Sequence, residues 1–167
     1  MIELLVWRHA KTEPAAAGHS DFARELRPVG RRHARSIGRW IAERGPIPEV
    51  VICSASVRTR ETADIAIAEF ARPPARFDLD ELYVADSSDY IPIIAIHGGS
   101  ATRTLIVAHN PATAQFVSQL AGRSVHMSPG TLAVVEADAP RASELTPRTP
   151  LRLRDVITPP GKSRDRY

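Results

Sequence analysis

The sequence has very little cysteine: Cys53 is the single one among 167 residues. No disulfide can form within the chain, so the fold must be held together by its apolar core. This is typical of proteins of a reducing compartment such as the cytoplasm. Cys53 ends the apolar run of residues 50–53, and burial in apolar surroundings predicts an inert thiol.

Long hydrophobic runs are also missing from the sequence. No apolar stretch approaches the roughly 18 residues that a membrane-spanning helix needs. The first seven residues contain Glu3 and a short apolar run, whereas a secretory signal has a basic start and a longer apolar core. We therefore expect a cytoplasmic protein that does not interact with membranes.

Excess positive charge is concentrated at one end of the chain. The net charge is +3, but residues 141–167 hold seven basic and three acidic residues, and the rest of the chain carries a balance of −1. A nucleic-acid-binding protein typically carries its basic charge as a patch on the fold. We expect one domain over residues 1–158, a flexible basic tail over residues 159–167, and no nucleic-acid partner. A tail that serves as a binding arm is the alternative.

Short apolar segments alternate with stretches of helical periodicity. This alternation is typical of an α/β domain with a mainly parallel, buried sheet. Residues 8–28 lack periodicity and predict a long loop, which in compact domains is usually functional or disordered. Strands are expected at residues 2–7, 50–53, 104–108, 131–135 and 151–157, helices at residues 29–44, 57–70, 87–97 and 111–121, and a connection with room for a short strand at residues 77–83.

Basic side chains follow three of the expected strands. Arg8 and His9 come after the first strand, Ser54 and Arg58 after the second, and His109 after the strand at residues 104–108. In open α/β sheets, ligands bind outside the carboxyl ends of the strands. Guanidinium groups and helix N-termini both bind phosphate. The sequence therefore predicts an anion site at this edge of the sheet.

A histidine in such a site can serve as a covalent nucleophile for phosphoryl transfer. The imidazole must be neutral to attack. Neighbouring arginines disfavour the imidazolium and lower the histidine pKa. The pattern thus combines a phosphate clamp with a nucleophile that the clamp keeps unprotonated.

Three motifs resemble those of the histidine phosphatase superfamily. Residues 5–12, centred on Arg8-His9, are similar to its Arg-His-Gly signature. The segment Ser54-x-x-x-Arg58-x-x-x-Thr62 is similar to the second motif, and residues 106–111, with His109, are similar to the third. Within the superfamily, residues 21–30 and 82–85 resemble the small SixA-type phosphohistidine phosphatases. This resemblance implies a three-layer α/β/α sandwich with a mainly parallel, mixed-edge sheet, which is phosphoglycerate mutase-like without the inserted subdomain.

The resemblance also implies roles for four residues. His9 would take the phosphoryl group, Arg8 and Arg58 would hold its oxygens, and His109 would donate hydrogen bonds to the transferring group. No metal and no other cofactor is implied. Lys11 and Thr12 follow the nucleophile in the sequence and are candidates for contact with substrate.

Three further residues lie in or near the expected site. Ala10 stands where the superfamily usually has glycine, which its backbone tolerates only if φ is not positive. Glu81 lies in the region where larger members hold a general acid, and an ordinary surface residue is the alternative. Asp21 is expected to pair with Arg24 or Arg27 near the mouth of the site.

We therefore expect a metal-independent phosphatase that removes phosphate from phosphohistidine on a partner protein of the histidine phosphotransfer type. The first alternative keeps the chemistry and takes a small phosphate ester, such as a sugar phosphate or nucleotide. The second is a non-catalytic module that binds phosphorylated proteins. The other histidines lack metal-ligand spacing and are expected to be structural. The sequence leaves the oligomeric state open.

Overall fold

A computed structural model describes residues 1–160 and 162–166 of the chain, and the side chains of residues 1–160. The strands are β1 (Ile2–Arg8), β2 (Val50–Ser54), β3 (Ala75–Leu79), β4 (Arg103–Ala108), β5 (Leu132–Ala137), β6 (Leu151–Thr158) and β7 (Lys162–Arg166). The α-helices are α1 (Pro28–Glu43), α2 (Val57–Ile67), α3 (Glu81–Val84), α4 (Tyr90–Gly98) and α5 (Ala112–Ala121), and the 3-10 turns are η1 (Asp21–Ala23), η2 (Ser87–Asp89) and η3 (Ala142–Glu144). Within the described part of the chain, no helix is long and apolar enough to cross a membrane.

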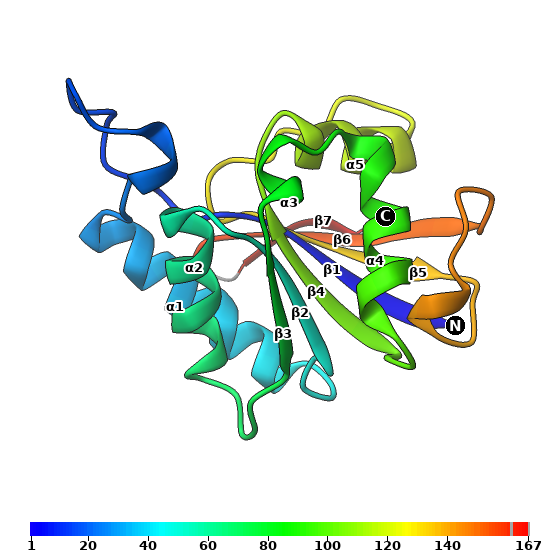
Figure 1. The fold of residues 1–167 in the computed structure, drawn as a ribbon. Helices are drawn as coiled ribbons and strands as arrows, with labels where there is room; N and C mark the ends of the chain where they lie inside the picture. Colours follow the sequence, from blue (N-terminus) through cyan, green and yellow to red (C-terminus); the bar gives the residue numbers. More distant parts are fainter. Residues whose placement is uncertain (161, 167) are drawn as a thin grey trace.

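The strands form one mixed sheet in the order β3-β2-β4-β1-β5-β6-β7. Strands β1 to β4 run parallel, and β5, β6 and β7 follow beyond β1, each antiparallel to the strand before it in the sheet. Helices α1 and α2 lie on one side of the sheet, and α4 and α5 on the other (Figure 1). The predicted three-layer α/β/α sandwich with a mainly parallel, mixed-edge sheet is confirmed.

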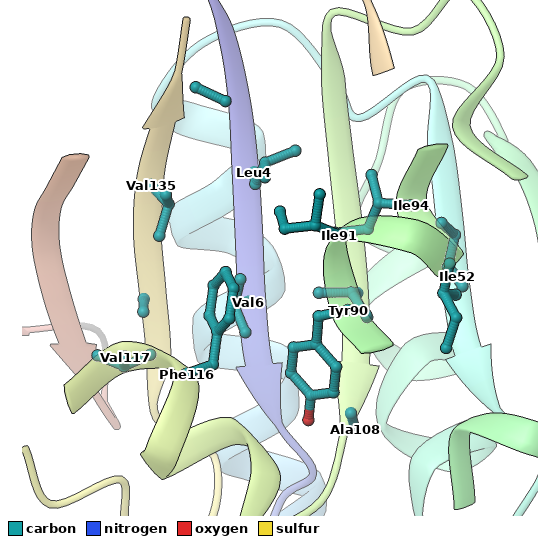
Figure 2. Packing of buried hydrophobic residues seen from close by; sticks show 14 of the residues in the cluster. Leu4, Val6, Ile52, Tyr90, Ile91, Ile94, Ala108, Phe116, Val117 and Val135 are labelled. Carbon is teal, nitrogen blue, oxygen red and sulfur yellow. The ribbon is translucent and has the colours of Figure 1, made fainter. Parts of the chain in front are cut away.

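Successive side chains of the central strand β1 point to opposite sides of the sheet. The strand is buried on both faces because a hydrophobic core covers each side. Leu4 and Val6 belong to the core that packs beneath α4 and α5, where Tyr90 and Phe116 fill the space (Figure 2). Leu5 and Trp7 belong to the core on the opposite face, together with buried residues of α1. This double burial explains why β1 reads as a continuous apolar run.

Two strands differ from the sequence prediction. Strand β3 begins two residues before the expected connection at residues 77–83, in which the sequence left room for a short strand, and its side chains are largely exposed because it forms an edge of the sheet. Lys162–Arg166 forms β7 against the open edge of β6, where a flexible basic tail was predicted. Backbone pairing needs no apolar alternation, so neither strand leaves a strong pattern. Residues 161 and 167 of that predicted tail lie outside the described residues.

Candidate active site

The parallel register brings three strand ends to one edge of the sheet. Arg8 at the end of β1 is level with Ala108 at the end of β4, and Cys53 of β2 is level with Val107. The backbone N–H of His9 donates to the carbonyl of Ala108 at 3.1 Å. The strand-end residues that the sequence singled out are therefore neighbours in space.

His9 is held in one tautomer by its own loop. Its Nδ1 lies 2.8 Å from the carbonyl oxygen of Ala10, and a carbonyl only accepts, so Nδ1 carries the proton. The Nε2 lone pair is then available for attack. His9 is 8% exposed, so this nucleophile is almost enclosed by protein.

Residues of the second motif form hydrogen bonds with the loop that follows His9. The Ala10 N–H donates to the Thr62 hydroxyl at 3.1 Å, and that hydroxyl donates to the Arg58 carbonyl at 2.7 Å. Ala10 is fully buried, and no non-glycine residue in the described ranges has a positive φ. The alanine in place of glycine therefore fits without backbone strain.

His109 faces His9 across the site. The two ring centroids are 5.3 Å apart, which leaves both imidazoles within reach of one small anion. The Nε2 of His109 lies 2.8 Å from the hydroxyl of Ser54 at the end of β2. The ring of Tyr83 meets His109 edge-on at 5.4 Å between centroids.

Two guanidinium groups flank the histidines. Arg8 donates from Nη1 to the carbonyl of Met127 at 2.7 Å. Arg58 is 6% exposed and donates from Nη1 to the Asp21 carbonyl at 2.6 Å and from Nη2 to the Asp21 carboxylate at 3.0 Å. The buried Nε atoms of both arginines and Nδ1 of His109 have no partner among the described residues. Such unpaired buried nitrogens need an explanation, and an anionic ligand supplies a partner for the arginine donors.

These residues line a cavity of about 380 Å³. The lining includes all four residues that were predicted to act on the phosphoryl group. It also includes Lys11 and Thr12, the two candidates for contact with substrate. The remaining lining residues had no predicted contact with substrate. The cavity is lined by Arg8, His9, Lys11, Thr12, Arg24, Arg58, His109, Asn110 and Pro129.

Asp21 ties the long loop to the site. Its carboxylate accepts from Arg24 at 2.9 Å, from Arg58 at 3.0 Å and from the Tyr83 hydroxyl at 2.8 Å. Arg24 was one of its two predicted partners, while Arg27 instead pairs with Glu13 at 3.5 Å. The hydrogen bonds from Arg24 and Tyr83, together with Arg58, hold the pKa of Asp21 far below its usual range. Asp21 is therefore ionised and has no proton to donate.

The structure does not bring Glu81, the candidate general acid, into the cavity. Glu81 begins the short helix α3, is 61% exposed, and lies 3.6 Å from Nε2 of His97 on α4. Its side chain contacts His97 and does not line the cavity. Among the described residues, no group of three or more His, Cys, Asp or Glu side chains is arranged to hold a metal ion.

Both site histidines are neutral near pH 7. Burial lowers the pKa of His9 to about 3, with smaller contributions from His109, Arg58 and Arg8. Burial also lowers the pKa of His109 to about 4, followed by the effect of Arg58. The sequence predicted the direction of the His9 pKa shift but assigned it to the arginines, whereas loss of solvent is the larger cause.

This electrostatic environment predicts a flat titration. Because both pKa values lie below 5, neither ring should take up a proton when the folded protein is titrated from pH 8 to pH 5. The measurement is the ¹⁵N shift of ring nitrogens in histidine-labelled protein. When the protein is unfolded in urea, the same histidines should titrate with a pKa of about 6.5, the value for unperturbed histidine. A midpoint near 6.5 for His9 in the folded protein would contradict the expectation.

Several residues at the site were missed or had no role assigned by the sequence. Asn110 lies inside the third motif and donates to the Met127 carbonyl at 3.0 Å. Arg24 and Tyr83 lie in segments that resemble the SixA type. Arg24 was predicted as a partner of Asp21 but not as a residue of the cavity, and Tyr83 had no predicted role. Pro129 comes from the loop before β5 and left no signal.

Comparison with known proteins agrees with the geometry. Residues 4–86 match the model of the histidine phosphatase superfamily (branch 1). An uncharacterized protein of Mycobacterium leprae is 34% identical over 103 residues, which are 62% of this chain and 62% of that protein. The uncharacterized protein Rv1276c of Mycobacterium tuberculosis is 36% identical over 150 residues, which cover 89% of this chain and 86% of the relative.

A solved structure extends the agreement to the whole fold. A candidate phosphohistidine phosphatase SixA from Nakamurella multipartitia superposes with a TM-score of 0.81 at 25% identity, covering 95% of this chain and 96% of that one. The chain therefore belongs to the histidine phosphatase superfamily and is of the SixA type.

Proposed function

We propose that this phosphatase hydrolyses phosphohistidine on a partner protein, with His9 as the covalent acceptor and no metal. Nε2 of His9 attacks phosphorus and the P–N bond of the substrate breaks. The partner's imidazole leaves as a neutral base, because its other ring nitrogen has taken up a proton from solvent. Water then cleaves the phosphoryl-His9 bond and releases inorganic phosphate. Positioning and charge stabilisation carry most of the catalysis of such a transfer.

The main support for phosphohistidine as the substrate is that the described cavity lining contains no carboxylic acid. An alkoxide leaving group needs an acid to protonate it. The nearby carboxylates do not fill that role, because Asp21 is held ionised and Glu81 lies outside the cavity. The imidazole of phosphohistidine carries a second, basic ring nitrogen, which accepts a proton from solvent far more readily than an ester oxygen does.

The charge of the cavity suits the transferred group. Arg8 and Arg58 supply fixed positive charge on two sides of the histidines, and Lys11 and Arg24 add more at the rim. Preorganised donors of this kind are worth about 3 kcal/mol each in acyl-transfer enzymes. The same charges stabilise a phosphoryl group as it passes between two nitrogens.

A matched substrate set tests the proposal. One carrier protein would be prepared with a single phosphohistidine or a single phosphoserine, and p-nitrophenyl phosphate would be the small ester whose leaving group needs no protonation. We expect kcat/KM on phosphohistidine to exceed that on phosphoserine by at least about 100-fold, since only the serine alkoxide needs the missing acid.

Other outcomes would redirect the assignment. Efficient hydrolysis of a sugar phosphate or nucleotide, with phosphohistidine untouched, would contradict the proposed substrate and favour a small-ester phosphatase. Binding of phosphohistidine protein without release of phosphate or formation of a phosphoenzyme would instead indicate a non-catalytic module.

A further inference from the structure

Ser54 is the residue of the second motif that the proposed chemistry leaves without a role. It ends β2 and is fully buried. Its hydroxyl lies 2.8 Å from Nε2 of His109. Among residues 1–160, the hydroxyl of Ser54 has no other hydrogen-bond partner. The buried hydroxyl and the ring nitrogen therefore depend on each other.

The direction of this hydrogen bond follows from the needs of the hydroxyl. A serine hydroxyl carries one proton to donate, and a neutral imidazole has one donor nitrogen and one acceptor nitrogen. If Nε2 carried the proton, the Ser54 O–H would be buried with no acceptor, with or without a ligand, which is unfavourable. The Nδ1–H of the other tautomer also lacks a protein acceptor, but it gains one when an anion occupies the cavity that His109 lines. If Ser54 donates, the hydroxyl is satisfied and Nε2 accepts. The proton of His109 then resides on Nδ1.

We propose that Ser54 is a positioning residue that donates to Nε2 of His109 and thereby fixes the Nδ1–H tautomer. That N–H is buried and has no acceptor among the described residues. It becomes a donor to a phosphoryl oxygen held between His9 and His109. In the opposite tautomer, a lone pair would face the oxygen and repel it.

The surroundings restrict the ring to small movements. The His109 carbonyl accepts from the backbone N–H of Thr113 at 3.0 Å and from its hydroxyl at 2.9 Å. Tyr83 packs edge-on against the ring. With the backbone and one ring face fixed, the choice of tautomer is left to Ser54. Its buried position at the end of β2 is set by the sheet.

The tautomer can be tested on the free protein without any substrate. The spectrum of ¹⁵N-histidine protein at pH 7 distinguishes a protonated from an unprotonated nitrogen at each ring position, and a His109→Asn variant assigns the signals. We expect Nδ1–H in the wild type and a mixture with Nε2–H in Ser54→Ala. A wild-type ring protonated at Nε2, or an unchanged tautomer in Ser54→Ala, would overturn the proposal.

The catalytic consequence rests on the proposed function and is measured separately. Ser54→Ala should lower kcat on phosphohistidine protein by about tenfold or more while KM changes little, because the lost hydrogen bond strengthens in the transition state. Ser54→Thr, which keeps the hydroxyl, should recover part of the rate.

The matched control is Ser56→Ala. Ser56 is equally buried, two residues further along, but its hydroxyl bonds Thr59 at 2.6 Å and does not touch His109. An equal loss of kcat in both alanine variants would indicate a merely structural role and overturn the positioning role. A wild type with the Nδ1–H tautomer but no phosphohistidine turnover would refute the proposed function and leave the tautomer assignment standing.

Discussion

Substitution of His9 by glutamine is expected to lower kcat/KM on phosphohistidine protein by about four orders of magnitude or more. Glutamine keeps a polar side chain of similar reach but cannot accept the phosphoryl group. Rapid quenching of the wild type during turnover should yield protein heavier by one phosphoryl group on His9. The variant should show neither steady turnover nor the added mass.

A suitable control for this variant is His19→Gln. His19 is exposed in the loop that follows the nucleophile and does not line the cavity. It should retain wild-type kcat/KM and still form the phosphoenzyme. Undiminished turnover by the His9 variant would show that phosphate passes directly to water or to another residue, and the covalent route would have to be abandoned.

The sequence predicted the centre of the fold well because buried strands leave a strong signal there. Strands β1, β2 and β4 are almost wholly buried, and their side chains on both faces are mostly apolar. Strand β1 ends at Arg8, β2 ends at Ser54, and β4 ends at the residue before His109. The rule that ligands bind at the carboxyl ends of parallel strands then sufficed to locate the cavity.

Edge elements and long-range contacts could not be predicted in the same way. Strand β3 exposes most of its side chains at the sheet edge, so its sequence looks like that of a connection. The contact between Asp21 and Arg58 joins a loop to a helix 37 positions away, and no periodicity encodes it. The direction of the Glu81 side chain depends on where α4 places His97. Its position in the sequence, near that of an acid in larger relatives, was therefore no guide to its contacts.

Burial also decided the electrostatics of the site. The arginines beside His9 are visible in the sequence, and their effect has the predicted sign. The larger cause is the exclusion of water from a ring that is 8% exposed, which depends on how β1, its loop and the neighbouring strand ends pack together. Counting nearby charges therefore gave the direction of the pKa shift but missed its main cause.

Substitution of Arg58 by lysine should lower kcat/KM by about 100-fold to 1,000-fold, although the positive charge is kept. The Arg58 guanidinium bonds the carbonyl and the carboxylate of Asp21 through its two Nη groups, while its Nε remains unpaired. One planar group can thus hold the loop and still offer a donor to phosphate. A lysine ammonium presents its donors at a single point, so it would have to choose between Asp21 and the phosphoryl oxygens.

The matched control is Arg60→Lys, an exposed position two residues along the same helix α2. It should leave kcat/KM and the melting temperature unchanged. In Arg58→Lys the loss should persist at saturating substrate, because the guanidinium stabilises the transition state more than the bound substrate. A variant with normal kcat and only a raised KM would show that Arg58 contributes uniform binding. Its geometry with Asp21 would then serve to order the loop and not to orient the transferred group.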